Sequence, residues 1–209
     1  MSLKKIISYV DLGNSSRKGV QLTAAIAENH GASVEVVLTA AKMNLYSTAV
    51  GGEPVFIPPG LAMTLLSNKQ DANDARLAQA VQVIEAENPE GEITTHKLGD
   101  SQVDSLIEHA RESKADLIVM SCEPAGIFDR VFHRSFAEKL ARSSSCPVVV
   151  MAADAEVNSN LRNVLVATDY SNCSRRAAFA ARDIVGEKGK LNFHHVVPWS
   201  ELAQSEASF

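Results

Sequence analysis

Short apolar segments that alternate with helical segments constrain the fold of this chain more than any other feature of its sequence. "ADLIVM", which starts at Ala115, is an unbroken apolar run of strand length. Such runs are typical of parallel sheets, because helices cover both faces of those sheets. The segments between the runs carry apolar residues at helical spacing, such as Val103, Leu106 and Ala110. The pattern predicts an α/β fold whose parallel strands are joined by right-handed crossovers.

Five strands of this kind alternate with helices in about the first 150 residues. Local signals support the helices: Asn14 or Ser15 can cap the first of them, and Gly31 can end it in a left-handed conformation. The glycine- and proline-rich segment 44–60 has no period and predicts a long loop. A short helix is expected over 135–142. We therefore predict an open, doubly wound, five-stranded parallel sheet.

The beginning of this pattern recurs near the end of the chain. Residues 163–198 align without a gap with residues 5–40. The alignment includes six identical residues, among them Asp169 opposite Asp11, so it predicts a duplication. The second copy stops after its second strand, which leaves a strand edge uncovered. The predicted organisation is a first domain over 1–153, a linker over 154–160, and the strand–helix–strand half of a second repeat over 161–209.

Composition limits the classes of partner. The net charge of −5 gives no electrostatic reason for binding nucleic acid. No apolar run reaches the roughly 18–20 residues that span a bilayer. The three cysteines are widely spaced and odd in number, which favours reduced thiols over a disulfide framework. We expect a cytoplasmic protein with neither nucleic acid nor a membrane as its partner.

Several motifs resemble one family. The strand-ending Asp11 and Asp169 are followed by helices that open with "SRK" and "SRR". "ADLIVMS" leads into a loop, and "RSFAEKLARSSSCPVVVM" follows it. These features resemble the universal stress protein family in its tandem form, in which the loop reads G-x-x-G, nine residues, then G-S. The resemblance implies an adenine-nucleotide alpha-hydrolase-like fold and ATP or AMP as a ligand. A homodimer is expected because the strand "PVVVM" would be an unpaired edge that a second copy can pair with.

The resemblance also implies a binding site. The strand-end aspartate and the end of the second strand would hold adenine and ribose, and the loop with its final serine would hold the phosphates. The carboxyl ends of parallel strands are where ligands bind in open sheets. The implied contact residues are Asp11, Thr39, Gly126, Arg134, Ser135 and Asp169.

The phosphate loop departs from the family pattern. Its three glycine positions carry Ser121, Pro124 and Arg134. Glycine lets the backbone approach phosphate closely, whereas proline has no N–H to donate. One interpretation is that the first domain has lost tight ATP binding. The alternative is that Arg134 supplies side-chain charge in place of the lost donors, with Asp11 and Ser135 completing the site.

No catalytic motif is present, so the sequence predicts a protein that is not an enzyme. No metal site is predicted either, because the adjacent His194 and His195 should point to opposite faces of a strand. An aspartate between a strand and a helix also often serves the turn itself, which is a second interpretation of Asp11 and Asp169. We expect a stress-response protein that acts through binding and self-association.

Overall fold

The structure is a computed structural model, and it describes residues 3–10, 16–39, 46–48, 54–56, 58–99, 103–122, 129–152, 155–156, 161–186 and 189–195. The chain divides into two compact units, each of which is described by itself. The first unit comprises residues 3–159, and the second comprises residues 160–209 together with residues 1–2.

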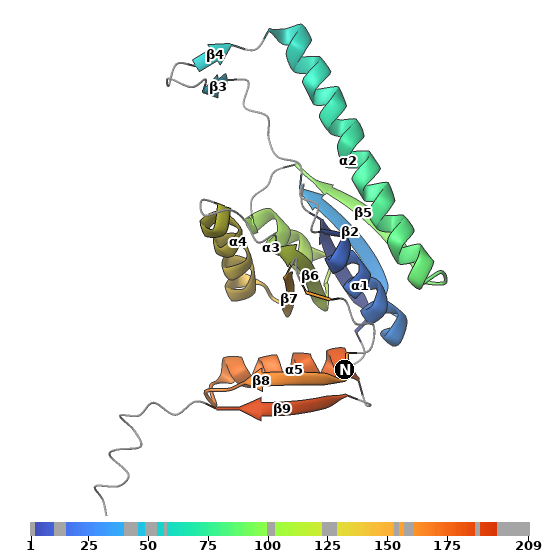
Figure 1. The fold of residues 1–209 in the computed structure, drawn as a ribbon, viewed down its shortest axis with the longest axis vertical. Coiled ribbons are helices and arrows are strands. Elements are labelled where there is room, and N and C mark those ends of the chain that lie inside the picture. The colour runs from blue at the N-terminus through green and yellow to red at the C-terminus, as the bar shows by residue number, and fades with distance from the viewer. Residues whose placement is uncertain are drawn as a thin grey trace, which may run out of the picture. The chain divides into compact units, whose positions relative to one another are not determined.

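The first unit contains a five-stranded sheet in the order β5-β2-β1-β6-β7 (Figure 1). All of its neighbouring strands pair in parallel. This confirms the predicted open parallel sheet. The strands are β1 (Lys5–Val10), β2 (Ser33–Thr39), β5 (Ile93–Leu98), β6 (Leu117–Cys122) and β7 (Val148–Ala152).

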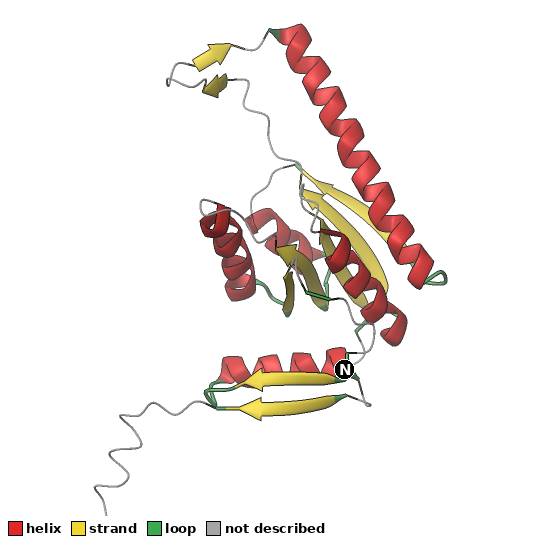
Figure 2. Cartoon of the chain, viewed as in Figure 1, coloured by secondary structure: helices red, strands yellow, loops and turns green. Residues whose placement is uncertain are grey.

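Helices cover both faces of this sheet (Figure 2), as a doubly wound fold requires. On one side α1 packs against α2, and on the other α3 packs against α4. The core under α3 and α4 includes Ile7, Tyr9, Leu106 and Leu140. The helices are α1 (Ser16–His30), α2 (Pro59–Glu87), α3 (Val103–Glu112) and α4 (Asp129–Ser143).

The first crossover shows how the sequence sets the connection. Helix α1 ends at His30, and Gly31 adopts a positive φ of 62°. The N–H of Ala32 then donates to the carbonyl of Ala27 at 3.1 Å, which is the bond of a Schellman motif. Because glycine pays no Cβ penalty in this conformation, the chain can turn directly into β2.

Two predicted boundaries are wrong. The predicted loop 44–60 contains two short antiparallel strands, β3 (Tyr46–Thr48) and β4 (Pro54–Phe56). Neither strand shows the alternation of apolar and polar residues by which a sequence reveals a strand. The helix expected over 135–142 begins six residues earlier, at Asp129, and ends at Ser143. The family's phosphate-loop pattern extends to Ser135, so it predicted a loop where the first turns of this helix lie.

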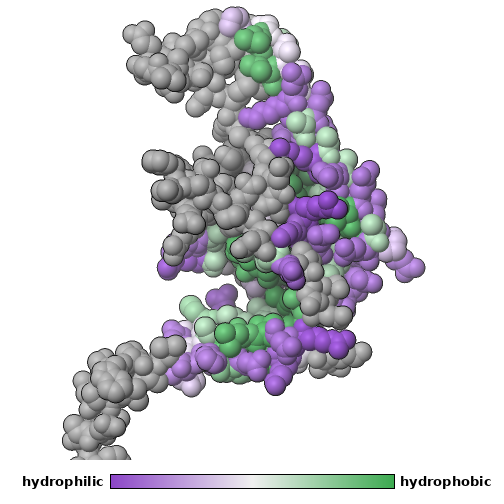
Figure 3. Space-filling model, in the orientation of Figure 1, coloured by the Kyte–Doolittle hydropathy of each residue, from purple (hydrophilic) through white to green (hydrophobic). Residues whose placement is uncertain are grey.

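Helix α2 has 29 residues and changes character along its length. Its first turns expose Leu61, Met63 and Leu65, with Met63 72% exposed. Figure 3 shows hydrophobic atoms gathered at this end of α2 and mostly hydrophilic atoms along the rest of the visible surface of that helix. Among the helices of the described residues, none is long and apolar enough to span a membrane.

The second unit contains β8 (Asn163–Ala167), α5 (Asn172–Val185) and β9 (Lys190–His194). Strands β8 and β9 pair in parallel, as β1 and β2 do. Their register differs by one residue, however. Lys5 pairs with Ser33 in the first unit, whereas Asn163 pairs with Lys190 rather than with Leu191, the residue that the gap-free alignment requires.

The gap-free alignment is therefore wrong between α5 and β9. Helix α5 ends at Val185, and Gly186 follows it with a φ of 66°, in the place that the alignment gave to Gly189. The shorter connection pairs Leu191 with Val164, so apolar residues of both strands share a face of the two-stranded sheet. That this unit is an incomplete copy of the first domain stays a prediction.

Candidate functional site

Thr39 ends β2 at the carboxyl edge of the sheet, where the sequence predicted a ligand. Its side chain is buried, and its hydroxyl shares a hydrogen bond of 2.9 Å with the hydroxyl of Tyr9 on β1. The Tyr9 ring stacks on Phe136 of α4, with 5.3 Å between the ring centroids. The Thr39 side chain thus ties the ends of two strands together, and it is engaged in the core rather than pointing at a ligand.

Ser121 was assigned to the first lost glycine of the phosphate loop, but the structure places it inside β6. Its side chain is 2% exposed, and its Oγ accepts a hydrogen bond of 2.9 Å from the backbone N–H of Gly19. A Cβ at Gly19 would lie only 2.5 Å from that Oγ. Ser121 and Gly19 therefore form a close contact between β6 and the start of α1, where helical N–H groups lack partners of their own.

The remaining predicted contacts of the first unit are described only in part. Asp11 and Gly126 lie outside the described residues. Arg134 and Ser135 have their backbone in α4, one turn and more past its start at Asp129, and their side chains lie outside the described part. The structure therefore shortens the predicted loop, because β6 runs to Cys122 and α4 begins at Asp129.

Asp169 follows β8 in the second unit and serves the turn before α5. Its Oδ1 accepts a hydrogen bond of 2.9 Å from the N–H of Ser171, whose hydroxyl caps α5 by accepting from the N–H of Ser174. Hydrogen bonds from the Ser171 side chain and backbone, and from Ser174, lower the pKa of Asp169 to about 2. The arrangement matches the turn interpretation of this aspartate.

A hollow of about 400 Å³ lies beside this turn in the second unit. Tyr170 and His195 line it, with 4.6 Å between their ring centroids, and Nδ1 of His195 lies 2.7 Å from the carbonyl oxygen of Thr168. Phe179 and Phe193 add apolar surface and are more than half exposed. Asp169 itself does not line this hollow.

Comparison with known proteins decides the family. A sequence model described as the Universal stress protein family matches residues 2–152, which include the whole five-stranded sheet. The chain belongs to the universal stress protein family. A search of curated proteins finds no match.

Solved structures of universal stress proteins share the fold. One, in complex with cAMP, is 22% identical with a TM-score of 0.53, over 72% of this chain and 98% of that one. The universal stress protein UspA from Lactobacillus plantarum is 18% identical with a TM-score of 0.54, over 72% and 99%. A universal stress protein from Archaeoglobus fulgidus DSM 4304 is 21% identical with a TM-score of 0.69, over 97% and 73%.

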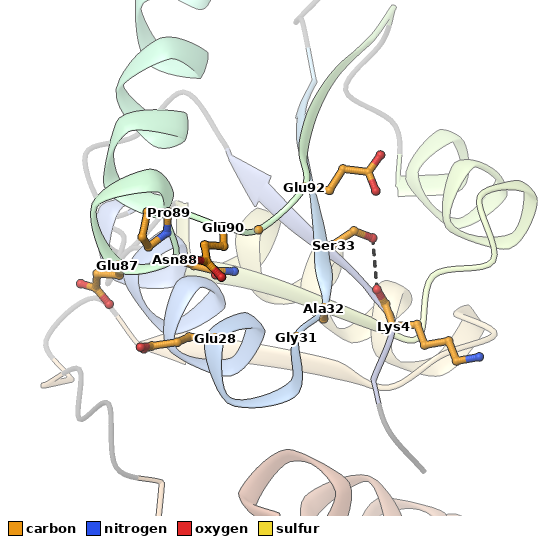
Figure 4. A pocket seen from close by; sticks show the side chains of 11 residues that line it. Lys4, Glu28, Gly31, Ala32, Ser33, Glu87, Asn88, Pro89, Glu90 and Glu92 are labelled. Atoms are coloured by element: carbon orange, nitrogen blue, oxygen red, sulfur yellow. Dashed lines mark hydrogen bonds between the residues drawn. The ribbon is translucent and has the colours of Figure 1, made fainter.

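The opposite, amino-terminal edge of the sheet in this universal stress protein holds a larger hollow of about 690 Å³ (Figure 4). Glutamates dominate its lining, with Lys4 beside them; they are Glu28, Glu87, Glu90 and Glu92. Asn88 packs closely on Gly91: a Cβ added at position 91 would lie 2.3 Å from Nδ2 of Asn88. No residue that the sequence assigned to a site lines this hollow.

A cluster of ionisable groups in the first unit escaped the sequence analysis. Glu35 on β2 is 7% exposed, and its carboxylate lies 2.8 Å from Nζ of Lys5 and 3.0 Å from Nε2 of His109 on α3. Burial acts to raise the pKa of Glu35, but Lys5 and His109 outweigh it and lower that pKa. The one sequence signal for this cluster was Glu35 itself, a charged residue within the mainly apolar strand segment "SVEVVLT".

Proposed function

We propose that this universal stress protein acts in the stress response through binding and self-association, without catalysis, and that its first unit lacks tight ATP binding. The observation that carries the proposal is the replacement of all three glycines of the family's phosphate loop. One of the three replacements, Ser121, also has a structural contact of its own. The Ser121 hydroxyl accepts a hydrogen bond from the backbone N–H of Gly19 in the first turns of α1. N–H groups at the start of a helix are donors that anion-binding sites commonly use, so this one is already engaged.

Other features of the carboxyl edge support the same proposal. Pro124 has no N–H to offer a phosphate, and its fixed φ limits the shape of the loop. The Thr39 hydroxyl is bonded to Tyr9 and buried. Backbone donors are hard to replace with side chains, because a cradle of N–H groups surrounds an anion at short range.

The alternative is an ATP- or AMP-binding module that uses Asp11, Arg134 and Ser135. Two observations favour it. One solved universal stress protein carries cAMP, and the early start of α4 puts Arg134 and Ser135 on a helix instead of a loop. A guanidinium can pair with phosphate through two parallel hydrogen bonds, which would offset part of the loss of backbone donors.

Titration of ATP into the purified chain by calorimetry separates the two. The proposal predicts no binding in the micromolar range. Micromolar binding that Asp11→Ala and Ser135→Ala both weaken would instead establish the alternative. An assay for phosphate and pyrophosphate release tests the non-enzymatic part, for which we expect no release above a buffer blank.

Self-association is proposed through β7, which forms one edge of the five-stranded sheet. An edge strand presents unpaired N–H and carbonyl groups that a second copy can pair with. Val150 of this strand is 44% exposed. We expect a homodimer by light scattering after gel filtration, and Val150→Asp should convert it to a monomer; a monomeric wild-type chain would refute this route.

The same proposal places the protein in the cytoplasm, with neither nucleic acid nor a membrane as its partner. It assigns any nucleotide site of a complete tandem protein to the second repeat, near Asp169. The lost glycines of the first unit motivate that assignment. A second repeat that lacked a glycine loop of its own would overturn it.

A further inference from the structure

Three metal-ligating side chains from separate elements meet beside α3. Glu35 comes from β2, His96 from β5 and His109 from the last turn of α3. One ligating atom from each lies within 4.8 Å of the other two. The three positions are 35, 96 and 109, so their proximity is a product of the fold and not of local sequence.

Glu35 is the anchor of this cluster. Its side chain is 9% exposed and stands in a strand whose other residues beyond Ser33 are buried and mainly apolar. Burying a carboxylate is costly unless partners compensate it. One oxygen, Oε1, lies 3.0 Å from Nε2 of His109, and the other, Oε2, lies 2.8 Å from Nζ of Lys5. Lys5 therefore holds one oxygen while the other faces the histidines.

His96 completes the cluster from the edge strand β5. Its ring stacks on that of His109, with 4.1 Å between centroids and 19° between the planes. Among the described residues, neither ring nitrogen of His96 takes part in a hydrogen bond. The side chain is partly exposed, so it has room to turn and the cluster can be reached from the rim of the sheet.

These distances fit one divalent ion after a small rearrangement. Zn²⁺ takes histidine nitrogen and carboxylate oxygen at about 2.0–2.2 Å, so ligand atoms of a tetrahedral site lie about 3.4 Å apart. Glu35 and His109 already approach to 3.0 Å. The His96 ring must rotate out of its stack so that its nitrogen points at the ion. Two histidines and one carboxylate leave the fourth position to water.

We propose that Glu35, His96 and His109 bind one Zn²⁺ ion. Oε1 of Glu35 and one ring nitrogen of each histidine are the ligands, and Lys5 orients the carboxylate through Oε2, as groups around metal ligands commonly do. The site lies among the first residues of β2 and under the end of α3, so it does not depend on nucleotide binding at the other edge.

Calorimetric titration of ZnCl₂ into the chelator-treated full chain tests the proposal. We expect one ion per chain and a Kd in the micromolar range or below. His96→Gln and His109→Gln should each weaken binding at least tenfold, since even groups outside the ligand set cost about 10–100-fold. His30→Gln and His194→Gln are matched controls that should leave the affinity unchanged.

Two further measurements keep the test decisive. Zn²⁺ should raise the melting temperature of the wild-type chain and of His30→Gln but not that of His96→Gln, which checks that the variant folds and has lost the ion. Co²⁺ should give a visible d–d band without a sulfur charge-transfer band, because no thiol is a ligand. Absence of binding, binding unchanged in both histidine variants, or a charge-transfer band lost in Cys173→Ser would each overturn the site.

Discussion

Replacing Gly19 by alanine should destabilise the first unit through its contact with Ser121. The new Cβ would lie 2.5 Å from Oγ of Ser121 and 3.3 Å from its backbone nitrogen. Rotating Oγ away would break the hydrogen bond from the Gly19 N–H. Because the neighbouring backbone of β6 is also close, the strand and the helix cannot relax by moving a flexible side chain alone.

The magnitude follows from three contributions. Overpacking costs about 1–3 kcal/mol, and loss of the hydrogen bond costs about 0.5–1.5 kcal/mol. Alanine regains about 1 kcal/mol over glycine within a helix. We therefore expect Gly19→Ala to lower the free energy of unfolding by about 1–3 kcal/mol, which corresponds to a fall of about 3–9 °C in melting temperature.

Urea denaturation followed by circular dichroism measures this change. Gly60→Ala is the matched control, since Gly60 lies in the first turn of α2 with nothing within 4 Å of its added Cβ. That control should be neutral or slightly stabilising. The cost of Gly19→Ala should also shrink when Ser121→Ala removes Oγ. A Gly19→Ala protein as stable as the wild type would refute the reasoning.

Three further predictions concern other parts of the molecule. NMR titration should place the pKa of Asp169 near 2, below the value of 3.8 expected for an unperturbed aspartate. Because the folded pKa is the lower one, this aspartate's contribution to stability should be complete above about pH 4 and be lost as pH falls towards 2. An unshifted titration would contradict the turn. Cys173 is exposed and Cys146 is buried with a raised pKa, so Cys173→Ser should remove a fast phase of reaction with a disulfide reagent and Cys146→Ser should not. Leu106→Ala should cost about 2–5 kcal/mol because the side chain is fully buried, whereas Leu61→Ala, 54% exposed, should change stability by less than about 0.5 kcal/mol.

The sequence predicted the sheet well because its signals are local. The central strands are mainly apolar, and α3 carries one apolar face whose Val103, Leu106 and Ala110 are all buried. Gly31 ended α1 as expected, with the positive φ that glycine favours. Such features depend on residues close together in the chain, so a pattern can reveal them.

The errors arose where distant residues decide the structure. The β3–β4 pairing joins segments without alternation. The first turns of α4 were missed because the family pattern predicted a phosphate loop there. The one-residue difference in the β8–β9 register was hidden because Gly189 coincides with Gly31 in the alignment. Ser121 was predicted to lie in the phosphate loop, but in the structure it lies in β6 and accepts a hydrogen bond from Gly19 of α1.

The site could be predicted only in outline. Family motifs located the carboxyl edge, and the structure shows Thr39 there but engages its side chain with Tyr9. The cluster of Glu35, His96 and His109 left almost no trace in the sequence, because three elements each contribute one residue. Its parts become a site only when β2, β5 and α3 are packed together.

The central claim is that the lost glycines abolish tight ATP binding in the first unit. The most direct test compares the Kd for ATP of the wild-type chain with that of a Pro124→Gly/Arg134→Gly variant, measured by calorimetry under the same conditions. We predict no micromolar binding by the wild type and at least tenfold tighter binding by the variant. Micromolar binding by the wild type that the two glycines weaken would contradict the claim, because it would show that Arg134 supplies the phosphate contacts.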